Sequence, residues 1–309
     1  MTLLQLKMLR EIARQSLNIS AAAKALHTSQ PGVSRQIQML EKDLGVQLLV
    51  RQRNRIVSLS KTGHAILAAA QVLLNQADNI ELLAEDARGG SAGKLVVVTT
   101  HLHARYTILR PFKTLQKKYP DVQLFLFQAD PDDIPKLVKD GAADIGLNTS
   151  DDRSEQHAGV VCLSGNIIRR SAIMRRGHPL ARKKRLTLND FTAYPFVGYN
   201  PRSRSGSVIA RAFAGSSVAP RSIVQANDSD VIKAYVAEGL GIGVVPEMIL
   251  GRRLDEGLHA IDVTHLFPRS HTNINLRSDM HLRKYVSDFI QMVAPSWTRG
   301  AIQRAVGKT

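Results

Sequence analysis

The pattern of apolar and polar positions in the first sixty residues predicts a helical module with a buried core. Apolar side chains recur every three or four residues over positions 3–13 and again over 33–44, which is the spacing of one buried stripe on an α-helix. Alanines dominate residues 21–25, and such small side chains allow a second helix to cross closely. Two short helices around a tight turn at His27 therefore indicate a helix-turn-helix.

The polar face of the second short helix is predicted to contact DNA. Its side chains carry amide, hydroxyl and guanidinium groups, which hydrogen-bond to base edges or to phosphate oxygens. We predict DNA contacts from Ser29, Gln30, Pro31, Ser34, Arg35 and Gln38. An ordinary helical hairpin with a polar outer face is the alternative, because helix-turn-helix patterns also arise by chance.

A β-hairpin is predicted directly after these helices. Two apolar runs, 48–50 and 56–59, flank a polar turn over residues 51–55. The turn carries Arg51, Arg53 and Arg55 at alternate positions, and guanidinium groups suit phosphates or a narrow minor groove. We interpret the hairpin as the wing of a winged helix-turn-helix, with a solvated hairpin tip as the alternative.

A long apolar stripe predicts that the next helix pairs with another helix. Ser60 can cap its first turn, and the stripe keeps a four-three alternation to about residue 86. We predict dimerisation through Ile66, Ala70, Leu73, Ala77 and Ile80. The glycine-rich residues 89–93 should end the helix and form a flexible joint.

Alternating short apolar runs and helical patterns after residue 93 predict α/β architecture with parallel strands. Two such series should form two lobes with a cleft between them. Ligands bind at the carboxyl ends of strands in open α/β sheets, and helix N-termini favour anions. Three junctions carry hydroxyl groups, namely residues 99–101, 148–150 and 200–205. Together they predict a site for a small anion such as sulfate, although each one alone fits a helix cap or a turn equally well.

Composition and charge narrow the class of protein. The chain has 309 residues, of which 44% are hydrophobic, so it can form two or three compact units. Its net charge of +16 includes ten lysines and arginines against three acids in residues 1–62, which favours a polyanionic partner. The single cysteine, Cys162, and the lack of an export signal or a long apolar segment predict a cytoplasmic protein that does not cross a membrane.

Enzyme motifs do not emerge from the sequence. GLGIG at residues 239–243 lacks the dinucleotide-binding spacing, and no GxSxG, HExxH or P-loop string occurs. His101 and His103 could share a metal, but no further ligand completes a set, so we expect none. The alternatives to a DNA-binding regulator are a solute-binding protein or enzyme with the same two lobes, and a nucleoid-type architectural binder. The polar helix face that we predict to contact DNA, here called the recognition face, argues against a solute-binding protein or enzyme. The polar cleft argues against an architectural binder, which needs no effector pocket.

The order of wing, long helix and paired α/β units, together with SAAAKALHTSQPGVSRQIQMLEKDLG, resembles the LysR-type transcriptional regulators over essentially the whole chain. Three further stretches, TTHLHARY, NDSDVIKAYVAEGLGIGVV and LRKYVSDFIQMVAPSWTR, resemble the CysB subgroup, which governs sulfur assimilation and cysteine biosynthesis. The implied architecture is a winged helix-turn-helix (1–60), a linker helix (61–88), a hinge (89–93) and a periplasmic-binding-protein-like α/β effector domain, with subdomain I at 94–164 and 265–309 and subdomain II at 165–264.

The resemblance also implies function and partners. It predicts a regulator, not an enzyme, that binds double-stranded promoter DNA as a homotetramer of two dimers, with RNA polymerase as a candidate partner. A small-molecule effector rather than a resident cofactor should occupy the cleft. The resemblance points to Thr100, Leu102, His103, Thr149 and the region around Arg202, and the junctions add Thr99, His101, Ser203 and Arg204.

Two positions of the predicted effector site depart from the CysB pattern. Leu102 and His103 stand where the subgroup has threonine and glutamine, while Arg202 and Arg204 add charge that the pattern does not include. We therefore expect sulfate or a different sulfur-containing anion, or an acetylserine, as the effector. The alternatives are a LysR-type regulator of another pathway with a different organic anion, and a cytoplasmic two-lobed solute-binding protein.

Overall fold

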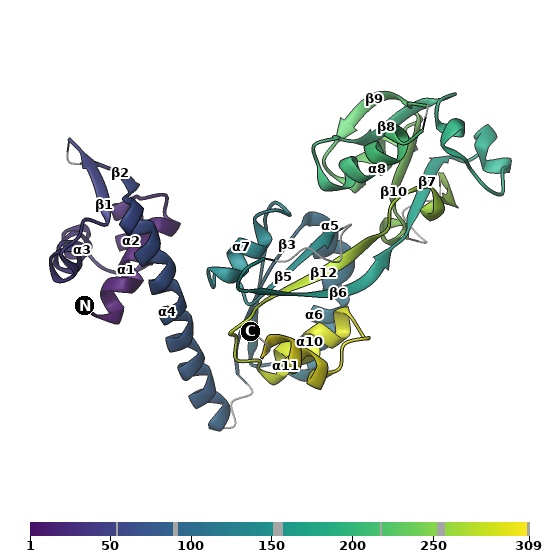
Figure 1. The fold of residues 1–309 in the computed structure, drawn as a ribbon. Coiled ribbons are helices and arrows are strands. Elements are labelled where there is room, and N and C mark those ends of the chain that lie inside the picture. The colour runs from purple at the N-terminus through teal and green to yellow at the C-terminus, as the bar shows by residue number, and fades with distance from the viewer. Residues whose placement is uncertain (54, 89–91, 151–156, 217, 252–256, 308–309) are drawn as a thin grey trace. The chain divides into compact units, whose positions relative to one another are not determined.

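The computed structural model describes residues 1–309 except 54, 89–91, 151–156, 217, 252–256 and 308–309 (Figure 1). The chain divides into two compact units. One comprises Met1–Gly90 with Asp279–His281, and the other comprises Ser91–Ser278 with Leu282–Thr309.

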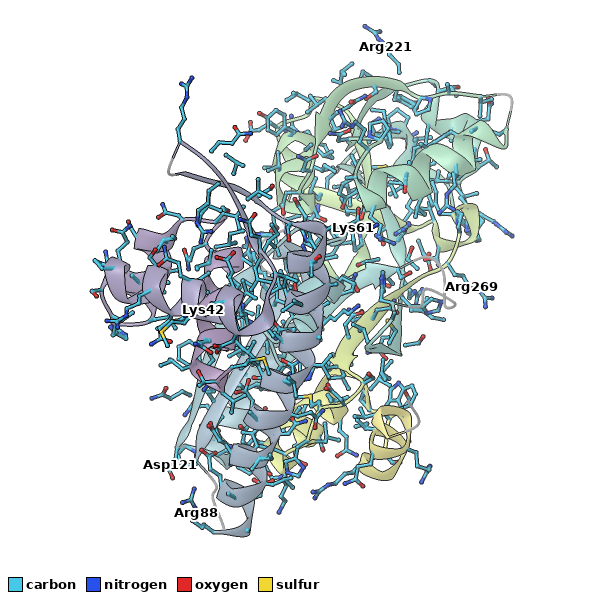
Figure 2. All side chains as sticks on the ribbon, turned by 60° about the vertical axis from the view of Figure 1, so that its left-hand side comes forward. Lys42, Lys61, Arg88, Asp121, Arg221 and Arg269 are labelled. Atoms are coloured by element: carbon cyan, nitrogen blue, oxygen red, sulfur yellow. The ribbon has the colours of Figure 1, made fainter. Side chains whose placement is uncertain are left out.

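The first unit is built from four helices and a two-stranded sheet. The elements are α1 (Leu3–Arg14), α2 (Ile19–Ala25), α3 (Gln30–Leu44), β1 (Leu49–Gln52), β2 (Arg55–Leu59) and α4 (Lys61–Ala87). Fully buried Leu9, Ile37 and Leu74 bring α1, α3 and α4 into one apolar core. Figure 2 shows Lys61 near one end of α4 and Arg88 near the other.

Side-chain caps fix where α3 and α4 begin. The Ser29 Oγ accepts a hydrogen bond from the Gly32 N–H at 3.2 Å, and the Ser60 Oγ accepts one from the Gly63 N–H at 2.8 Å. Both serines have extended backbone angles, as N-cap residues do. The predicted starts of both helices are therefore confirmed.

The hairpin differs from its predicted form. Strands β1 and β2 are antiparallel, and Gln52 pairs with Arg55, so the ladder includes residues that we expected in the turn. Arg53 lies in the remaining tight turn with a φ of 46°, in the left-handed region. The predicted five-residue turn was wrong because strand pairing, not local polarity, sets where a hairpin closes.

The second unit contains two lobes, each with its own five-stranded sheet. Lobe I has the strand order β4-β3-β5-β12-β6. Its strands are β3 (Gly93–Thr99), β4 (Val122–Gln128), β5 (Ile145–Ser150), β6 (Val160–Ile168) and β12 (Ser270–Arg277). Strand β3 is parallel to β4 and β5, but β12 is antiparallel to β5 and β6, so the sheet is mixed rather than purely parallel as predicted.

Helices cover both faces of the lobe I sheet. They are α5 (His101–His103), the π-helical η1 (Ala104–Ile108), α6 (Leu109–Lys118), α7 (Ile134–Lys139), α10 (Lys284–Val293) and α11 (Arg299–Val306). Figure 1 shows α7 on one side of the sheet and α10 with α11 on the other. The π-helical turn is continuous with α5 and α6, and such turns are frequent at functional sites.

Lobe II has the strand order β11-β7-β10-β8-β9. Its strands are β7 (Arg170–Arg175), β8 (Pro195–Tyr199), β9 (Arg221–Ala226), β10 (Ile242–Pro246) and β11 (Leu258–Asp262). Its helices are η2 (Pro179–Arg182), η3 (Leu188–Phe191), α8 (Arg204–Ala214), α9 (Ser229–Ala237), η4 (Glu247–Ile249) and η5 (Thr264–Leu266). Phe191 packs edge-on against Phe196 and Phe213 with ring centroids 6.0 Å apart in each pair, which anchors α8 to the sheet.

The backbone passes between the lobes twice. Strand β6 of lobe I leads directly into β7 of lobe II, and β11 leads back through η5 into β12. Two crossing segments allow one lobe to rotate against the other while each core stays intact.

Candidate DNA interface and effector cleft

The predicted recognition face is exposed on α3. The side chains of Gln30, Arg35 and Gln38 are exposed, whereas Val33 and Ile37 on the opposite face are fully buried. Ser34 is half-buried, and Pro31 is exposed in the first turn of the helix beside the Ser29 cap. The structure therefore places all six predicted DNA contacts between the Ser29 cap and the middle of α3.

The three wing arginines have different surroundings. The Arg51 Nη1 lies 3.1 Å from the Glu41 Oε2 on α3, so its charge is already paired. Glu41 also accepts hydrogen bonds from the Leu48 and Leu49 N–H groups, and the pair thereby fastens the wing to α3. Arg53 is exposed in the turn, and the side chain of Arg55 lies outside the described part of the structure.

The predicted dimerisation stripe on α4 covers two different faces. Ala70 is 2% exposed and Ile66 is partly buried, and both pack into the core of their own module. Leu73 and Ile80 are 50% and 67% exposed, and Ala77 is half-buried. Ala70 was therefore wrongly included, because one apolar periodicity served both the core of the module and the exposed face. Val72 and Leu83 are further exposed apolar residues of α4 that the predicted stripe did not include.

A cleft of about 1100 Å³ opens in the effector domain between the lobes. It is lined by residues 100–102, 128–133, 149, 199–200, 202–205 and 227–229. These segments follow β3, β4, β8 and β9 or close β5, so the cleft lies at strand ends, as predicted. Most of its lining residues have polar side chains, which include the Thr100 and Thr149 hydroxyls and charges of both signs.

Two predicted effector residues lie behind the cleft wall. Thr99 is fully buried, and its Oγ1 donates to the Leu147 carbonyl at 2.9 Å within the sheet. His103 is also fully buried, with Nδ1 2.9 Å from the Thr107 Oγ1 and Nε2 3.0 Å from the Thr149 Oγ1. Burial lowers the pKa of His103 to about 4, so its ring is neutral at pH 7. Neither side chain lines the cleft, because alternation along β3 turns Thr99 inward and the helical turn does the same to His103.

The loop before α8 forms one wall of the cleft. The Ser203 Oγ accepts from the Gly206 N–H at 3.1 Å and donates to the Asn200 carbonyl at 2.8 Å. A Cβ at Gly206 would lie 1.9 Å from the Asn200 oxygen, so this close turn requires glycine. Arg204 forms an ion pair with Asp132 of the other lobe at 2.5 Å, and Arg202 is exposed at the rim.

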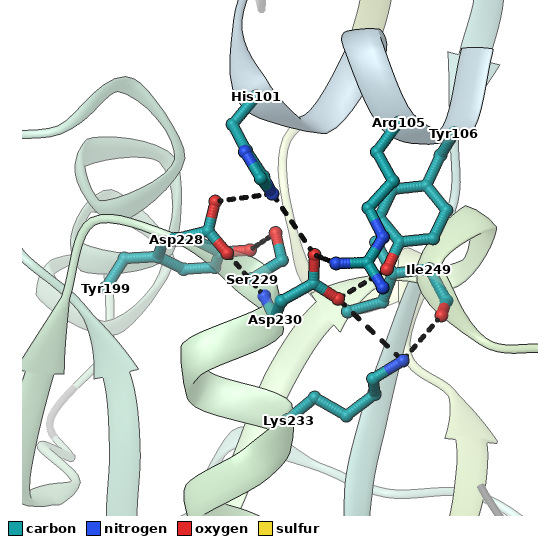
Figure 3. A network of polar contacts seen from close by, with 9 residues as sticks. All are labelled: His101, Arg105, Tyr106, Tyr199, Asp228, Ser229, Asp230, Lys233 and Ile249. Atoms are coloured by element: carbon teal, nitrogen blue, oxygen red, sulfur yellow. Dashed lines mark hydrogen bonds and ion pairs between the residues drawn. The ribbon is translucent and has the colours of Figure 1, made fainter. Parts of the chain in front are cut away.

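A polar network beside the cleft also joins the lobes (Figure 3). The Asp230 carboxylate of lobe II accepts hydrogen bonds from Arg105 at 3.1 Å and from the Tyr106 hydroxyl, and it lies 3.3 Å from the His101 Nε2. Burial and the Asp230 hydrogen bond raise the pKa of Tyr106 above its usual value. Lys233 lies 3.9 Å from the same carboxylate, so Asp230 is surrounded by donors from both lobes.

The sequence contained a partial signal for this network. Asp228 caps α9, because its Oδ1 accepts a hydrogen bond from the Asp230 N–H at 2.7 Å. His101, Asp228 and Asp230 place potential metal-ligand atoms within 4.8 Å of one another, but Arg105 already supplies a positive charge to Asp230. Arg105 was missed because its partner lies 125 positions away in the sequence.

This combination of a winged helix-turn-helix, a long helix and a two-lobed domain with a polar cleft defines a ligand-responsive DNA-binding regulator. The family model for the bacterial regulatory helix-turn-helix protein of the LysR family matches residues 3–64, and the model for the LysR substrate binding domain matches residues 88–298. The chain therefore belongs to the LysR family of transcriptional regulators, and it is a regulator rather than an enzyme.

Individual relatives agree with the predicted resemblance to CysB. The chain is 35% identical to the HTH-type transcriptional regulator SsuR of Burkholderia cenocepacia over 94% of each chain. It is 33% identical to CysB of the same organism, over 99% of this chain and 97% of that protein. It is 35% identical to the regulator Cbl of Escherichia coli, over 98% of this chain and 95% of that protein.

Solved structures support the fold. The cofactor-binding domain of the Cbl regulator matches 71% of this chain and 95% of its own, with a TM-score of 0.64 and 32% identity. Full-length CbnR in complex with its target DNA matches 96% of this chain and all of its own, with a TM-score of 0.60; at 24% identity it supports the fold alone. Among the described residues, no helix is long and apolar enough to cross a membrane.

Proposed function

We propose that this regulator controls genes of sulfur assimilation, cysteine biosynthesis or sulfonate use, and that a small anion in the cleft sets its activity. The observation that carries the proposal is the convergence of the Thr100 and Thr149 hydroxyls from lobe I with the α8 N-terminal loop from lobe II. Hydroxyl and N–H groups bind sulfate-like oxygens without requiring a full counter-charge.

The cleft chemistry favours an anion of low charge. Arg202 contributes a cation at the rim, while the charge of Arg204 is paired with Asp132. Asp130, Asp133 and Asp228 also line the cleft, and they disfavour a highly charged anion. An organic sulfonate and an acetylserine carry at most one net negative charge and suit this lining best, whereas sulfate, with two charges, depends more on the hydroxyl and N–H donors. The resemblance to the CysB subgroup favours these compounds over other organic anions.

Features of the first unit support dimerisation and DNA binding. Several large apolar side chains on α4 are at least half exposed, namely Val72, Leu73, Ile80 and Leu83. Burying them against a second copy of α4 would remove this apolar area from water. We propose a homodimer through this face, assembled further into a homotetramer on promoter DNA in the cytoplasm, where RNA polymerase is a candidate partner.

Calorimetry of the full-length chain with sulfate, acetylserines and methanesulfonate tests the effector site. Thr100→Val and Thr149→Val keep the shape of each side chain and remove one hydroxyl, so each should weaken anion binding. Thr114→Val is the matched control, because Thr114 is exposed on α6 and does not line the cleft. Binding that is unchanged in both cleft variants would place the site elsewhere. Genome-wide mapping of bound promoters tests the pathway, and targets unrelated to sulfur would contradict it.

A further inference from the structure

We infer that His103 is a positioning residue: its ring carries the proton on Nε2 and thereby fixes Thr149 as a hydrogen-bond donor toward the cleft. A wall that offers a hydroxyl hydrogen selects ligands with deprotonated oxygens. This inference rests on the proposed effector site, and it assigns a role to a residue that touches no ligand.

The geometry places His103 between two hydroxyl groups. Its Nδ1 lies 2.9 Å from the Thr107 Oγ1, and its Nε2 lies 3.0 Å from the Thr149 Oγ1. The ring is fully buried, whereas Thr149 lines the cleft. His103 therefore connects a hydroxyl outside the cleft to one that faces it.

A neutral imidazole carries one N–H group and one unprotonated nitrogen. Burial keeps the His103 ring neutral at pH 7, so one threonine must donate to the ring and the other must accept from it. Two arrangements satisfy this condition. In the first, Thr107 donates to Nδ1 and Nε2 donates to Thr149; in the second, both bonds are reversed.

The surroundings of Thr107 decide between the two arrangements. Within the described part of the chain, the other acceptor in contact with its hydroxyl is the Met248 Sδ at 3.9 Å, and a thioether sulfur is a weak acceptor. The second arrangement would direct the Thr107 hydrogen at this sulfur, although a ring nitrogen lies 2.9 Å away. The first arrangement gives each buried hydrogen a strong acceptor and leaves the Thr149 hydrogen free to reach water or a ligand.

The same polarity explains how histidine can replace the glutamine of the CysB pattern. A glutamine amide nitrogen can donate to Thr149 while its oxygen accepts from Thr107. The donor character of Thr149 would then survive His103→Gln. Leu102, which stands where the CysB subgroup has threonine, does line the cleft. Any difference in ligand preference from that subgroup should therefore arise at Leu102 and not at His103.

Nitrogen-15 NMR of the histidine rings tests the tautomer without any ligand. The chain has ten histidines, and loss of one signal set in His103→Gln assigns the ring. We expect a protonated Nε2 and an unprotonated Nδ1 for His103 in the effector-free, full-length protein. A proton on Nδ1 would overturn the inference while leaving the proposed effector site standing.

Calorimetry with sulfate and methanesulfonate tests the consequence. His103→Leu removes the donor to Thr149 and should lower anion affinity by about tenfold, whereas His103→Gln should stay close to wild type. Thr107→Val leaves the cleft wall intact but removes the group that fixes the tautomer, so it should weaken binding several-fold; Thr114→Val is its control on the following helix.

The outcomes separate the inference from the proposed function. Wild-type affinity in both His103→Leu and Thr107→Val would overturn the inference even if wild type binds sulfate. If His103→Leu fails to fold, the anion affinity of Thr107→Val and the NMR assignment of the His103 proton still test the inference. A wild-type protein that binds neither anion refutes the proposed effector site and the anion preference together, and the NMR result then judges the tautomer alone.

Discussion

Replacing Glu41 tests how the wing is attached to the recognition helix. The Glu41 Oε1 accepts hydrogen bonds from the Leu48 and Leu49 N–H groups at 2.8 and 3.0 Å, and its Oε2 pairs with Arg51. Glu41 is 9% exposed and both leucines are buried, so Glu41→Ala leaves two buried N–H donors without an acceptor. An unsatisfied buried donor costs about 1–3 kcal/mol, so we expect a loss of roughly 2–4 kcal/mol once partial entry of water is allowed for.

Two further variants isolate the cause. Glu41→Gln keeps an oxygen that can accept both N–H groups and removes only the negative charge, so it should lose roughly 1 kcal/mol or less. Asp43→Ala is the matched control, because it removes an exposed acid from the same helix. It should stay within about 0.5 kcal/mol of wild type.

Urea unfolding and amide hydrogen exchange across residues 46–60 provide the assay. The expected order of stability is wild type and Asp43→Ala, then Glu41→Gln, then Glu41→Ala, with the Leu48 and Leu49 amides losing protection first. Wild-type stability in Glu41→Ala would refute the role of Glu41 in attaching the wing to α3. Arg51 would then be expected to contact DNA like Arg53.

The remaining predictions concern DNA binding, assembly and pH. Arg53→Ala should weaken binding to all DNA similarly and flatten the salt dependence, whereas Arg35→Ala should cost about 1–3 kcal/mol of sequence discrimination if its guanidinium reads a base; equal losses on specific and random DNA for both variants would contradict this division. Leu73→Asp places a charge in the proposed dimer face and should yield smaller species in sedimentation, while Thr62→Asp, the same charge at an exposed polar position of α4, should not. The pKa of His103 falls from 6.5 unfolded to about 4 folded, so its stabilising contribution is complete above pH 6.5 and is lost as the pH falls toward 4. At about 1.4 kcal/mol per unit the loss approaches roughly 3 kcal/mol, and unfolding of His103→Gln should lack this part of the pH dependence.

The architecture was predictable because its signals are local. The N-caps Ser29 and Ser60 sit directly before apolar helical patterns, and each fixed a helix start correctly. The predicted fold class and LysR resemblance were confirmed for the same reason, because local patterns give the order of the helices and strands directly. The mixed sheet of lobe I was not predicted, because β12 returns from a distant part of the sequence and inserts between β5 and β6.

The site was predicted only in part, because neighbouring residues can face opposite sides of a wall. Thr99 and Thr100 are adjacent and chemically identical, yet only Thr100 lines the cleft. The predicted dimerisation stripe on α4 was wrong at Ala70 for a similar reason. Apolar spacing alone does not show whether a residue packs into its own module or remains exposed for a second copy. The contacts of Asp230 depend on the approach of two lobes, and no local pattern encodes such an approach.

Promoter affinity measured with and without anion tests the central claim most directly. Fluorescence anisotropy would use promoter fragments recovered from cells, with wild type and Thr149→Val compared at fixed salt concentration. An anion that binds one lobe angle better than another should shift the DNA affinity of wild type by about 5–150-fold, corresponding to 1–3 kcal/mol of coupling. Thr149→Val should match effector-free wild type on DNA and show little shift when anion is added. An equal shift in Thr149→Val, or no shift in wild type with any of the tested anions, would contradict control through the cleft.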